Sequence, residues 1–210
     1  MTNFVLARHG ETVWHVENRY AGRSDVPLTP RGKAQAELLA DWAATAELAA
    51  CVSSPLERAR DTAAPAAQAA GLLPRVDERL SELDFGAGEG RTAAEMRELF
   101  PDVFAEFHRD PITHHLPGGE HPRDAIERAT ASLHDLAQEL PRERVLVVSH
   151  STLMRLVLCN LLGITPTEYR RIFPFIRNVG LTEIRLDDGR CSLLEFNTPL
   201  ELARPATAVQ

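Results

Sequence analysis

Two histidines each follow a short apolar run, at a place where a side chain could take part in catalysis. The run at 4–7 (FVLA) leads into His9, and the run at 145–148 (VLVV) leads into His150. Such runs, without polar alternation, are typical of strands buried on both faces of a parallel sheet. Because ligands of open α/β sheets bind beyond the carboxyl ends of the strands, we expect both imidazoles at one rim.

Two arginines could place positive charge beside these histidines. Arg8 directly precedes His9, and Arg58 follows a weaker third run at 50–53 (ACVS). We expect Ser54 to cap the helix that carries Arg58 in its first turn, where a cation opposes the helix macrodipole unless an anion lies between them. One guanidinium can donate two parallel hydrogen bonds to two oxygens of a phosphoryl group. The two arginines therefore predict a pocket for a phosphoryl group.

Within such a pocket His9 could act as a nucleophile. The positive charges around it, to which a protonated His150 could add, lower its pKa and favour the neutral ring. A neutral imidazole can attack phosphorus, provided that an acceptor holds its other ring nitrogen. The leaving oxygen also needs an acid. Three carboxylates of the glycine-rich segment 80–90 are equal candidates by spacing alone: Glu82, Asp84 and Glu89.

Helical patterns lie between the expected strands. Thr29 and Pro30 have the residue types of an N-cap and a first helical position. Thr92 and Thr165 each begin a Thr-x-x-Glu capping box. We therefore predict helices over 30–44 and 54–70, from 92, over 122–140 and from 165.

The C-terminal part of the sequence carries a hairpin signal. Asp188 and Gly189 separate the runs 182–186 and 191–196, and this dipeptide favours a two-residue turn between antiparallel strands. Strands that alternate with helices indicate an α/β fold built from βαβ units. We expect one domain over residues 1–203, followed by a loose tail at 204–210.

Composition excludes several classes of function. The chain has 210 residues, of which 44% are hydrophobic and 25% charged, with a formal net charge of −7. This balance disfavours nucleic acid or an anionic membrane as a partner held by bulk charge. Cys51, Cys159 and Cys191 lack the C-x-x-C spacing of zinc or redox sites, so we expect them to be reduced. No apolar run is long enough for a signal peptide, which predicts a soluble cytoplasmic protein.

A cluster of histidines could suggest a metal site. No carboxylate or cysteine joins the cluster at ligand-like helical spacing, so we predict no metal. The cluster could instead contact the leaving group of a substrate or belong to a solvated loop. Its members are His108, His114, His115 and His121.

Five sequence blocks, in order, resemble the histidine phosphatase superfamily, which has the phosphoglycerate mutase-like fold. The opening block 8–12 (RHGET) resembles the signature of that superfamily. The further blocks are 53–63 (SSPLERARDTA), 82–90 (ELDFGAGEG), 117–120 (PGGE) and 147–150 (VVSH). The match covers most of the chain.

The resemblance implies a three-layer αβα sandwich, with a mostly parallel central sheet and an antiparallel C-terminal hairpin. It also implies catalysis through a phosphohistidine, without a metal or other cofactor. By position His9 is similar to the nucleophile of the family, and Glu82 is similar to its proton donor. Arg8, Arg58 and His150 resemble the residues of its phosphate pocket.

Three positions depart from the family pattern. His15 stands where an asparagine often contacts phosphate, so it could contact phosphate or form part of the pocket wall. Ser151 replaces the usual glycine after the second histidine. It could direct its backbone amide to phosphate, or its hydroxyl could cap the following helix. Ala87 stands where a bulkier residue is usual.

We therefore expect a metal-independent phosphomonoester hydrolase acting on a small phosphorylated metabolite. A cofactor-dependent phosphoglycerate mutase is the first alternative, although Leu83 follows Glu82 where the mutases carry an arginine. A non-catalytic protein that binds a phosphorylated ligand is the second. Apolar positions of the hairpin 180–196 could support a homodimer.

Overall fold

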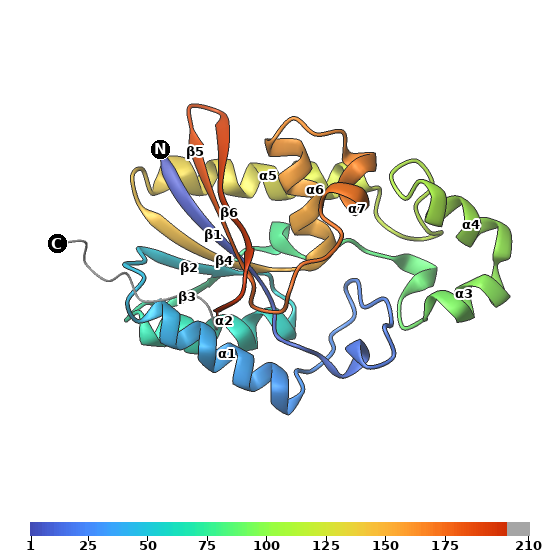
Figure 1. Ribbon diagram of the computed structural model, residues 1–210, viewed down its shortest axis with the longest axis horizontal. Coiled ribbons are helices and arrows are strands. Elements are labelled where there is room, and N and C mark those ends of the chain that lie inside the picture. Colours follow the sequence, from blue (N-terminus) through green and yellow to red (C-terminus); the bar gives the residue numbers. More distant parts are fainter. Residues whose placement is uncertain (201–210) are drawn as a thin grey trace.

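The computed structural model describes residues 1–200 and has an α/β fold built on a six-stranded sheet (Figure 1). The strand order is β3-β2-β4-β1-β5-β6. Strands β1 to β4 pair in parallel, and β5 and β6 are antiparallel, which confirms the mostly parallel sheet with an antiparallel hairpin. The strands are β1 (Thr2–Arg8), β2 (Ala50–Ser53), β3 (Pro74–Val76), β4 (Arg144–Ser149), β5 (Leu181–Asp187) and β6 (Arg190–Thr198).

The two central strands are apolar on both faces because helices cover both. Val5 and Leu146 belong to one hydrophobic cluster, whereas Phe4 and Val145 belong to the other. Helices α1 (Pro30–Ala43) and α2 (Glu57–Ala69) supply the first cluster, and α5 (Pro122–Glu139) and α6 (Ser151–Leu161) supply the second. Figure 1 shows the two helical layers on opposite sides of the sheet, which confirms the three-layer sandwich.

Register brings the ends of these strands together. In the parallel pair β1–β4, Phe4 pairs with Val145 and Arg8 pairs with Ser149. The backbone amide of His9 then donates a 3.0 Å hydrogen bond to the carbonyl of Ser149. The residues that follow both strands are therefore neighbours at the carboxyl edge of the sheet.

Shorter helices lie around this edge. Helices α3 (Ala93–Leu99) and α4 (Pro101–Arg109) project beyond the sheet, and α7 (Tyr169–Ile172) follows α6 (Figure 1). The sequence patterns predicted the start of α3, but they did not predict α4 or β3. The 3-10 helices are η1 (Val13–His15), η2 (Glu78–Leu80), η3 (Gly86–Gly88) and η4 (Pro166–Glu168).

Most of the predicted helix and turn signals are present. The Thr29 side chain accepts a hydrogen bond from the amide of Gly32, and the capping box at Thr92 is complete. Asp188 and Gly189 both have positive φ in the turn between β5 and β6. The predicted helix over 122–140 corresponds to α5.

Two capping predictions were wrong. Helix α2 begins at Glu57 with Leu56 as its N-cap. The Ser54 hydroxyl accepts from the amide of Leu56 at 3.3 Å, before the helix begins, and lies 2.7 Å from Nε2 of His150. Thr165 precedes a 3-10 turn and makes no side-chain capping bond.

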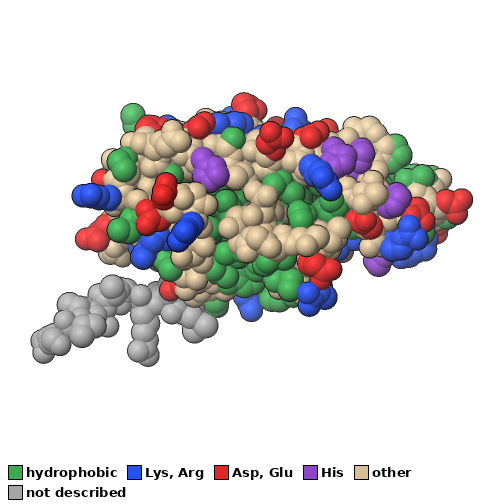
Figure 2. Space-filling model, turned by 90° about the horizontal axis from the view of Figure 1, so that it is seen from above, with side chains coloured by type: hydrophobic (Ala, Val, Ile, Leu, Met, Phe, Trp, Pro, Cys, Tyr) green, Lys and Arg blue, Asp and Glu red, His purple; other side chains and the backbone are tan. Residues whose placement is uncertain are grey.

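The face shown in Figure 2 carries acidic and basic side chains interspersed around an apolar centre. Within residues 1–200, no helix is long and apolar enough to cross a membrane. The expected tail at 204–210 lies outside the described residues.

Candidate active site

The two predicted histidines meet at the carboxyl edge of the sheet. Their ring centroids are 5.1 Å apart, and both side chains are buried. His9 lines a cavity of about 480 Å³, whereas His150 lies fully buried beside it and does not line the cavity. The structure therefore places both histidines at the rim where the sequence predicts them; their roles stay predictions.

Backbone contacts determine the tautomer of His9. Its Nδ1 lies 2.7 Å from the carbonyl oxygen of Gly10. Because a carbonyl can only accept, Nδ1 carries the proton and Nε2 keeps a free lone pair. Burial, followed by the charges of His150, Arg58 and Arg8, holds the pKa of His9 well below its usual value, so the ring is neutral. Gly10 thus supplies the acceptor that the sequence did not identify.

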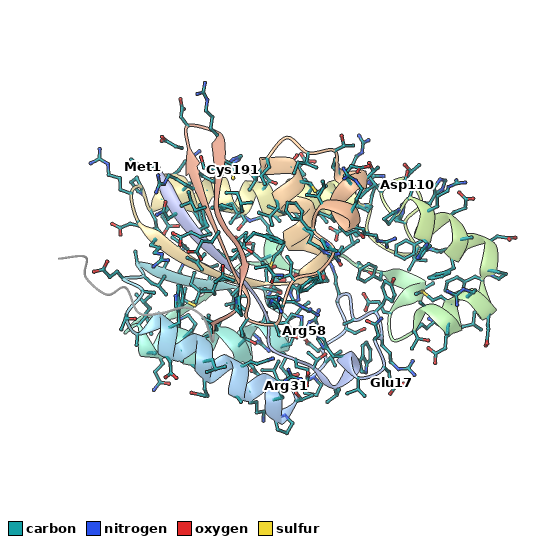
Figure 3. The ribbon with its side chains drawn as sticks, in the orientation of Figure 1. Met1, Glu17, Arg31, Arg58, Asp110 and Cys191 are labelled. Carbon is teal, nitrogen blue, oxygen red and sulfur yellow. The ribbon has the colours of Figure 1, made fainter. Side chains whose placement is uncertain are left out.

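The two predicted arginines lie beside His9 and are held by backbone carbonyls. Arg8 donates to the carbonyl of Ile176 at 2.8 Å, and Arg58 donates to those of Ser24 and Gly22 at 2.8 and 2.6 Å. Arg58 is 1% exposed and lies inside the molecule in Figure 3.

Neither guanidinium of this pair has a carboxylate within 4.0 Å among residues 1–200. Burial lowers the pKa of Arg8 to about 10 and also lowers that of Arg58. The Nε atoms of both are buried, and within the described chain they have no hydrogen-bond partner. The charge of Glu82 acts against this lowering of the pKa for both arginines. Because a buried cation without an ion pair is costly, this end of the cavity favours an anion.

His150 adds a further polar atom close to His9. Its Nε2 contacts the Ser54 hydroxyl, and its Nδ1 is buried without a partner in the part of the chain that the structure describes. Burial, together with Arg58 and Arg8, holds the pKa of His150 well below its usual value. When Ser54 donates its proton to Nε2, Nδ1 carries the ring proton and can donate it to an oxygen.

One of the three candidate carboxylates lines the cavity. Glu82 accepts hydrogen bonds from the amides of Thr152 and Leu153, at 3.0 and 2.8 Å, at the start of α6. Asp84 instead accepts from the amide of Gly86 at 2.7 Å. Glu89 accepts from the backbone amides of Arg23 and Ser24 and does not line the cavity. The three carboxylates were equal candidates for the acid by their spacing in the sequence, and their positions in the structure favour Glu82.

His15 lines the cavity and contacts Arg8. Its Nε2 lies 2.5 Å from a terminal nitrogen of Arg8, and its Nδ1 lies 2.8 Å from Oγ1 of Thr12. Because a guanidinium can only donate, Nε2 accepts from Arg8. Nδ1 also lies 3.0 Å from the backbone amide nitrogen of Thr12, so Thr12 holds that side of the ring through two atoms. Burial, followed by the charge of Arg8, lowers the pKa of His15 to about 4. The neutral ring orients Arg8.

Ser151 also lines the cavity, but it is the first residue of α6, and His150 is the N-cap. The predicted capping role of the Ser151 hydroxyl is therefore wrong. The first amides of a helix have no partner within the helix, so the backbone amide of Ser151 is available as a donor.

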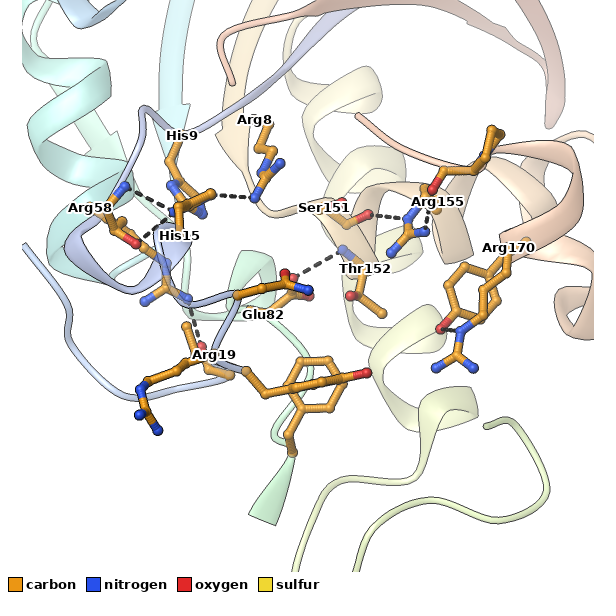
Figure 4. Close-up of a pocket in the computed structure, with 18 of the residues that line it drawn as sticks. Arg8, His9, His15, Arg19, Arg58, Glu82, Ser151, Thr152, Arg155 and Arg170 are labelled. Carbon is orange, nitrogen blue, oxygen red and sulfur yellow. Dashed lines mark hydrogen bonds between the residues drawn. The ribbon is translucent and has the colours of Figure 1, made fainter. Parts of the chain in front are cut away.

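The outer half of the cavity contains residues that sequence reasoning missed. This half is the end of the cavity away from His9, where Arg155 of α6 and Arg170 of α7 lie (Figure 4). Tyr20, Phe85 and Tyr169 also line the cavity. The only early signal was that Arg155 interrupts an otherwise apolar stretch. Of the histidine cluster only His108 lines the cavity, and within residues 1–200 no group of three His, Cys, Asp or Glu could hold a metal ion.

Comparison with known proteins identifies the family. The family model "Histidine phosphatase superfamily (branch 1)" matches residues 4–199. The chain is 31% identical over 203 residues to phosphoserine phosphatase 1 of Hydrogenobacter thermophilus, covering 96% of this chain and 95% of that protein. It is 34% identical over 185 residues to the probable phosphoglycerate mutase GpmB of Citrobacter koseri, covering 88% and 85%.

Solved structures of similar proteins share the fold. Bacillus stearothermophilus YhfR superposes with a TM-score of 0.88 at 30% identity, over 95% of this chain and 98% of that one. Mycobacterial glucosyl-3-phosphoglycerate phosphatase superposes with a TM-score of 0.85 at 27% identity, over 94% and 99%. The chain therefore belongs to the histidine phosphatase superfamily.

Proposed function

We propose that this protein hydrolyses phosphomonoesters through a phosphohistidine formed on His9. The observation that carries the proposal is the state of the His9 ring. It is neutral, its Nδ1 proton is bound to the Gly10 carbonyl, and it lies beside Arg8 and Arg58. A nucleophilic Nε2 next to two buried cations that form no ion pair in the described chain suits attack on a phosphoryl dianion.

In the first step, Nε2 of His9 attacks phosphorus. The P–N bond forms while the P–O bond to the leaving alcohol breaks, and Glu82, which is protonated at that moment, gives its proton to the departing oxygen. Arg8 and Arg58 stabilise the charge on the transferred group. His150 and the first amide of α6 are the further donors close by.

In the second step, water attacks the phosphohistidine. Glu82, now ionised, takes a proton from the water as the new P–O bond forms. The P–N bond breaks, and its electron pair returns to Nε2 of His9. Inorganic phosphate leaves, and both side chains return to their starting states without any metal ion or other cofactor.

Relatives support a phosphatase. Phosphoserine phosphatase 1 and glucosyl-3-phosphoglycerate phosphatase are named for the hydrolysis of phosphomonoesters. The second candidate is a phosphoglycerate mutase, favoured by the relatives named GpmB. It would share the first step and then return the phosphoryl group to an organic acceptor. Leu83, which follows Glu82, is buried in the core and offers no cation for the carboxylate of a phosphoglycerate.

The test is phosphate release from a panel of phosphomonoesters, including 3-phosphoglycerate, by wild-type and His9→Ala protein in excess EDTA. We expect release that survives EDTA and is lost with His9. Interconversion of 3- and 2-phosphoglycerate faster than phosphate release would favour the mutase. Tight binding of an ester without any turnover would favour a binding protein.

A further inference from the structure

Two arginines form the outer end of the cavity. The guanidinium of Arg155 lies over the ring of Tyr169 at 4.9 Å, and that of Arg170 lies over the same ring at 5.5 Å. Arg170 also lies over Phe107 of α4 at 5.1 Å. Stacking on aromatic faces orients guanidinium groups without neutralising them.

The polar contacts of both arginines leave their charge uncompensated. Nε of Arg155 donates to the carbonyl of Ser151 at 3.0 Å. Arg170 donates to the Tyr169 hydroxyl and to the carbonyl of His108, both at 3.0 Å. Across residues 1–200, neither arginine forms an ion pair with a carboxylate.

Other arginines close by are paired. Arg19 lines the same cavity and forms ion pairs with Glu17 and Glu95. Arg171, the neighbour of Arg170 in the chain, pairs with Glu168. Neighbouring arginines therefore have carboxylate partners, whereas Arg155 and Arg170 at the outer end of the cavity have none within the described chain.

The charges in the cavity do not balance. Five arginines line it, namely Arg8, Arg19, Arg58, Arg155 and Arg170. Arg19 is paired, so four remain against Glu82, the one acidic residue in its described lining. Burial lowers the pKa of Arg155. One phosphoryl dianion bound next to Arg8 and Arg58 would leave the charges of Arg155 and Arg170 without a partner. The cavity is thus locally basic, although the whole chain has a net charge of −7.

The geometry of the reaction directs the leaving group toward this pair. Displacement at phosphorus places the departing oxygen roughly in line with, and opposite to, the attacking Nε2 of His9. Glu82, which would protonate that oxygen, lies between His9 on one side and Arg155 and Arg170 on the other (Figure 4). The alcohol part of the ester therefore extends into the outer half of the cavity.

We propose that Arg155 and Arg170 bind a second anionic group, a carboxylate or a second phosphate, on the alcohol part of the substrate. The preferred substrates are then acidic phosphomonoesters in which the two anionic groups are bound at opposite ends of the cavity. This inference rests on the proposed function, because it assigns the leaving group of that reaction to the outer half.

Matched esters test it. The first pair is 3-phosphoglycerate and glycerol 3-phosphate, which differ by a carboxylate against a hydroxymethyl group. The second pair is the bisphosphate and the monophosphate of propane-1,3-diol. We expect wild-type kcat/KM to favour the acidic member of at least one pair by about tenfold or more, as a charge-assisted hydrogen bond gives. The pair with the larger ratio identifies the anion.

Substitutions of the two arginines test whether they cause the preference for acidic esters. Arg170→Ala should lower kcat/KM for the acidic ester about tenfold more than for its neutral partner. Arg155→Gln should act in the same direction, and Arg170→Lys should keep part of the preference. Arg171→Ala is the matched control, because Arg171 neighbours Arg170 but does not line the cavity. It should leave both rates unchanged.

A binding measurement separates this inference from the proposed function. Calorimetric titration of the His9→Ala protein with the same esters, with and without Arg170→Ala, does not depend on turnover. Tighter binding of the acidic esters that is lost with Arg170 supports the inference even if the wild-type protein releases no phosphate, which would contradict the proposed function alone. Equal kcat/KM within both pairs, or equal losses within a pair in both arginine variants, would overturn the inference.

Discussion

The inner and outer halves of the cavity are built in different ways. The inner half consists of Arg8 at the end of β1, of His9 and His150 directly after β1 and β4, and of Arg58 in the first turn of α2. Backbone carbonyls hold the two arginines and His9, and the Ser54 hydroxyl contacts His150. The outer half consists of Arg155 and Arg170, which are held by an aromatic ring and by helix ends. We therefore expect the inner half to carry out the proposed reaction. Because the side chains of the outer half can change without disturbing the sheet, we expect that half to select the ester.

The largest effect that separates the halves is expected at Arg58. Arg58→Gln removes a buried cation beside His9, and kcat/KM should fall by about 10²–10³-fold for every ester, as losses of transition-state donors do. The check is steady-state phosphate release from acidic and neutral esters. Arg31→Gln is the control, because Arg31 lies at the surface in Figure 3 with its side chain 75% exposed. A loss confined to acidic esters would break the division between the halves.

Glu82 lies between the halves, and its replacement should depend on the leaving group. In Glu82→Gln no proton is available for the departing oxygen, so kcat should fall by about 10²-fold or more for alkyl phosphates. An activated aryl phosphate such as p-nitrophenyl phosphate needs no acid and should lose much less in the first step. Equal losses for both kinds of ester, in single-turnover measurements, would contradict the role of Glu82 as the acid.

Stability should depend on pH through the inner half. The pKa values of His9, His15 and His150 lie below the ordinary value of 6.5 in the fold. The unfolded chain therefore binds more protons than the folded chain below pH 6.5. The contribution of these histidines to the free energy of unfolding is fully present above pH 6.5. It is lost as the pH falls, for His15 down to about pH 4. A fully buried histidine contributes up to about 1.4 kcal/mol per pH unit within its window, and the partly exposed His15 contributes less because solvent screens it.

Urea unfolding between pH 7.5 and pH 5 measures this slope. His15→Asn should make it shallower by the contribution of one histidine, whereas Arg170→Ala in the outer half should leave it unchanged. A free energy of unfolding that is flat across this range would show that the three histidines are not buried in their neutral form.

The smallest expected effect concerns the orientation of Arg8. His15→Ala removes the acceptor that His15 offers to Arg8, and kcat/KM should fall about five- to tenfold, as for the loss of one hydrogen bond. His15→Asn should retain more activity, because an amide oxygen can also accept from a guanidinium. Similar rates for Ala and Asn, measured on one neutral ester, would show that this contact does not orient Arg8.

Local patterns predicted the parts of the fold that local chemistry decides. Unbroken apolar runs located β1 and β4, Thr29 located the start of α1, and Asp188 with Gly189 located the turn of the hairpin. The same patterns failed where a distant residue competes for a side chain. Ser54 has the residue type of a cap, but its hydroxyl accepts from Leu56 before the helix begins and also contacts His150, which is remote in sequence.

The candidate site divides in the same way. His9 and His150 could be predicted because the parallel pairing of two strands brings their ends together. The Gly10 carbonyl, the only acceptor for Nδ1 of His9 among the described contacts, is invisible in a sequence because every residue has one. Arg155 and Arg170 lie over the same Tyr169 ring because α7 packs on α6, and no local spacing encodes that packing. The roles assigned to these side chains stay predictions until they are tested.

Direct detection of the covalent intermediate tests the central claim. The wild-type protein is mixed with a good substrate, quenched in alkali within milliseconds and digested, and the peptide that contains His9 is examined by mass spectrometry. We expect a phosphoryl group on Nε2 of His9 that is stable in alkali and labile in acid, and that is absent from His9→Ala. Rapid phosphate release with no modified His9 at any quench time would contradict the proposed mechanism.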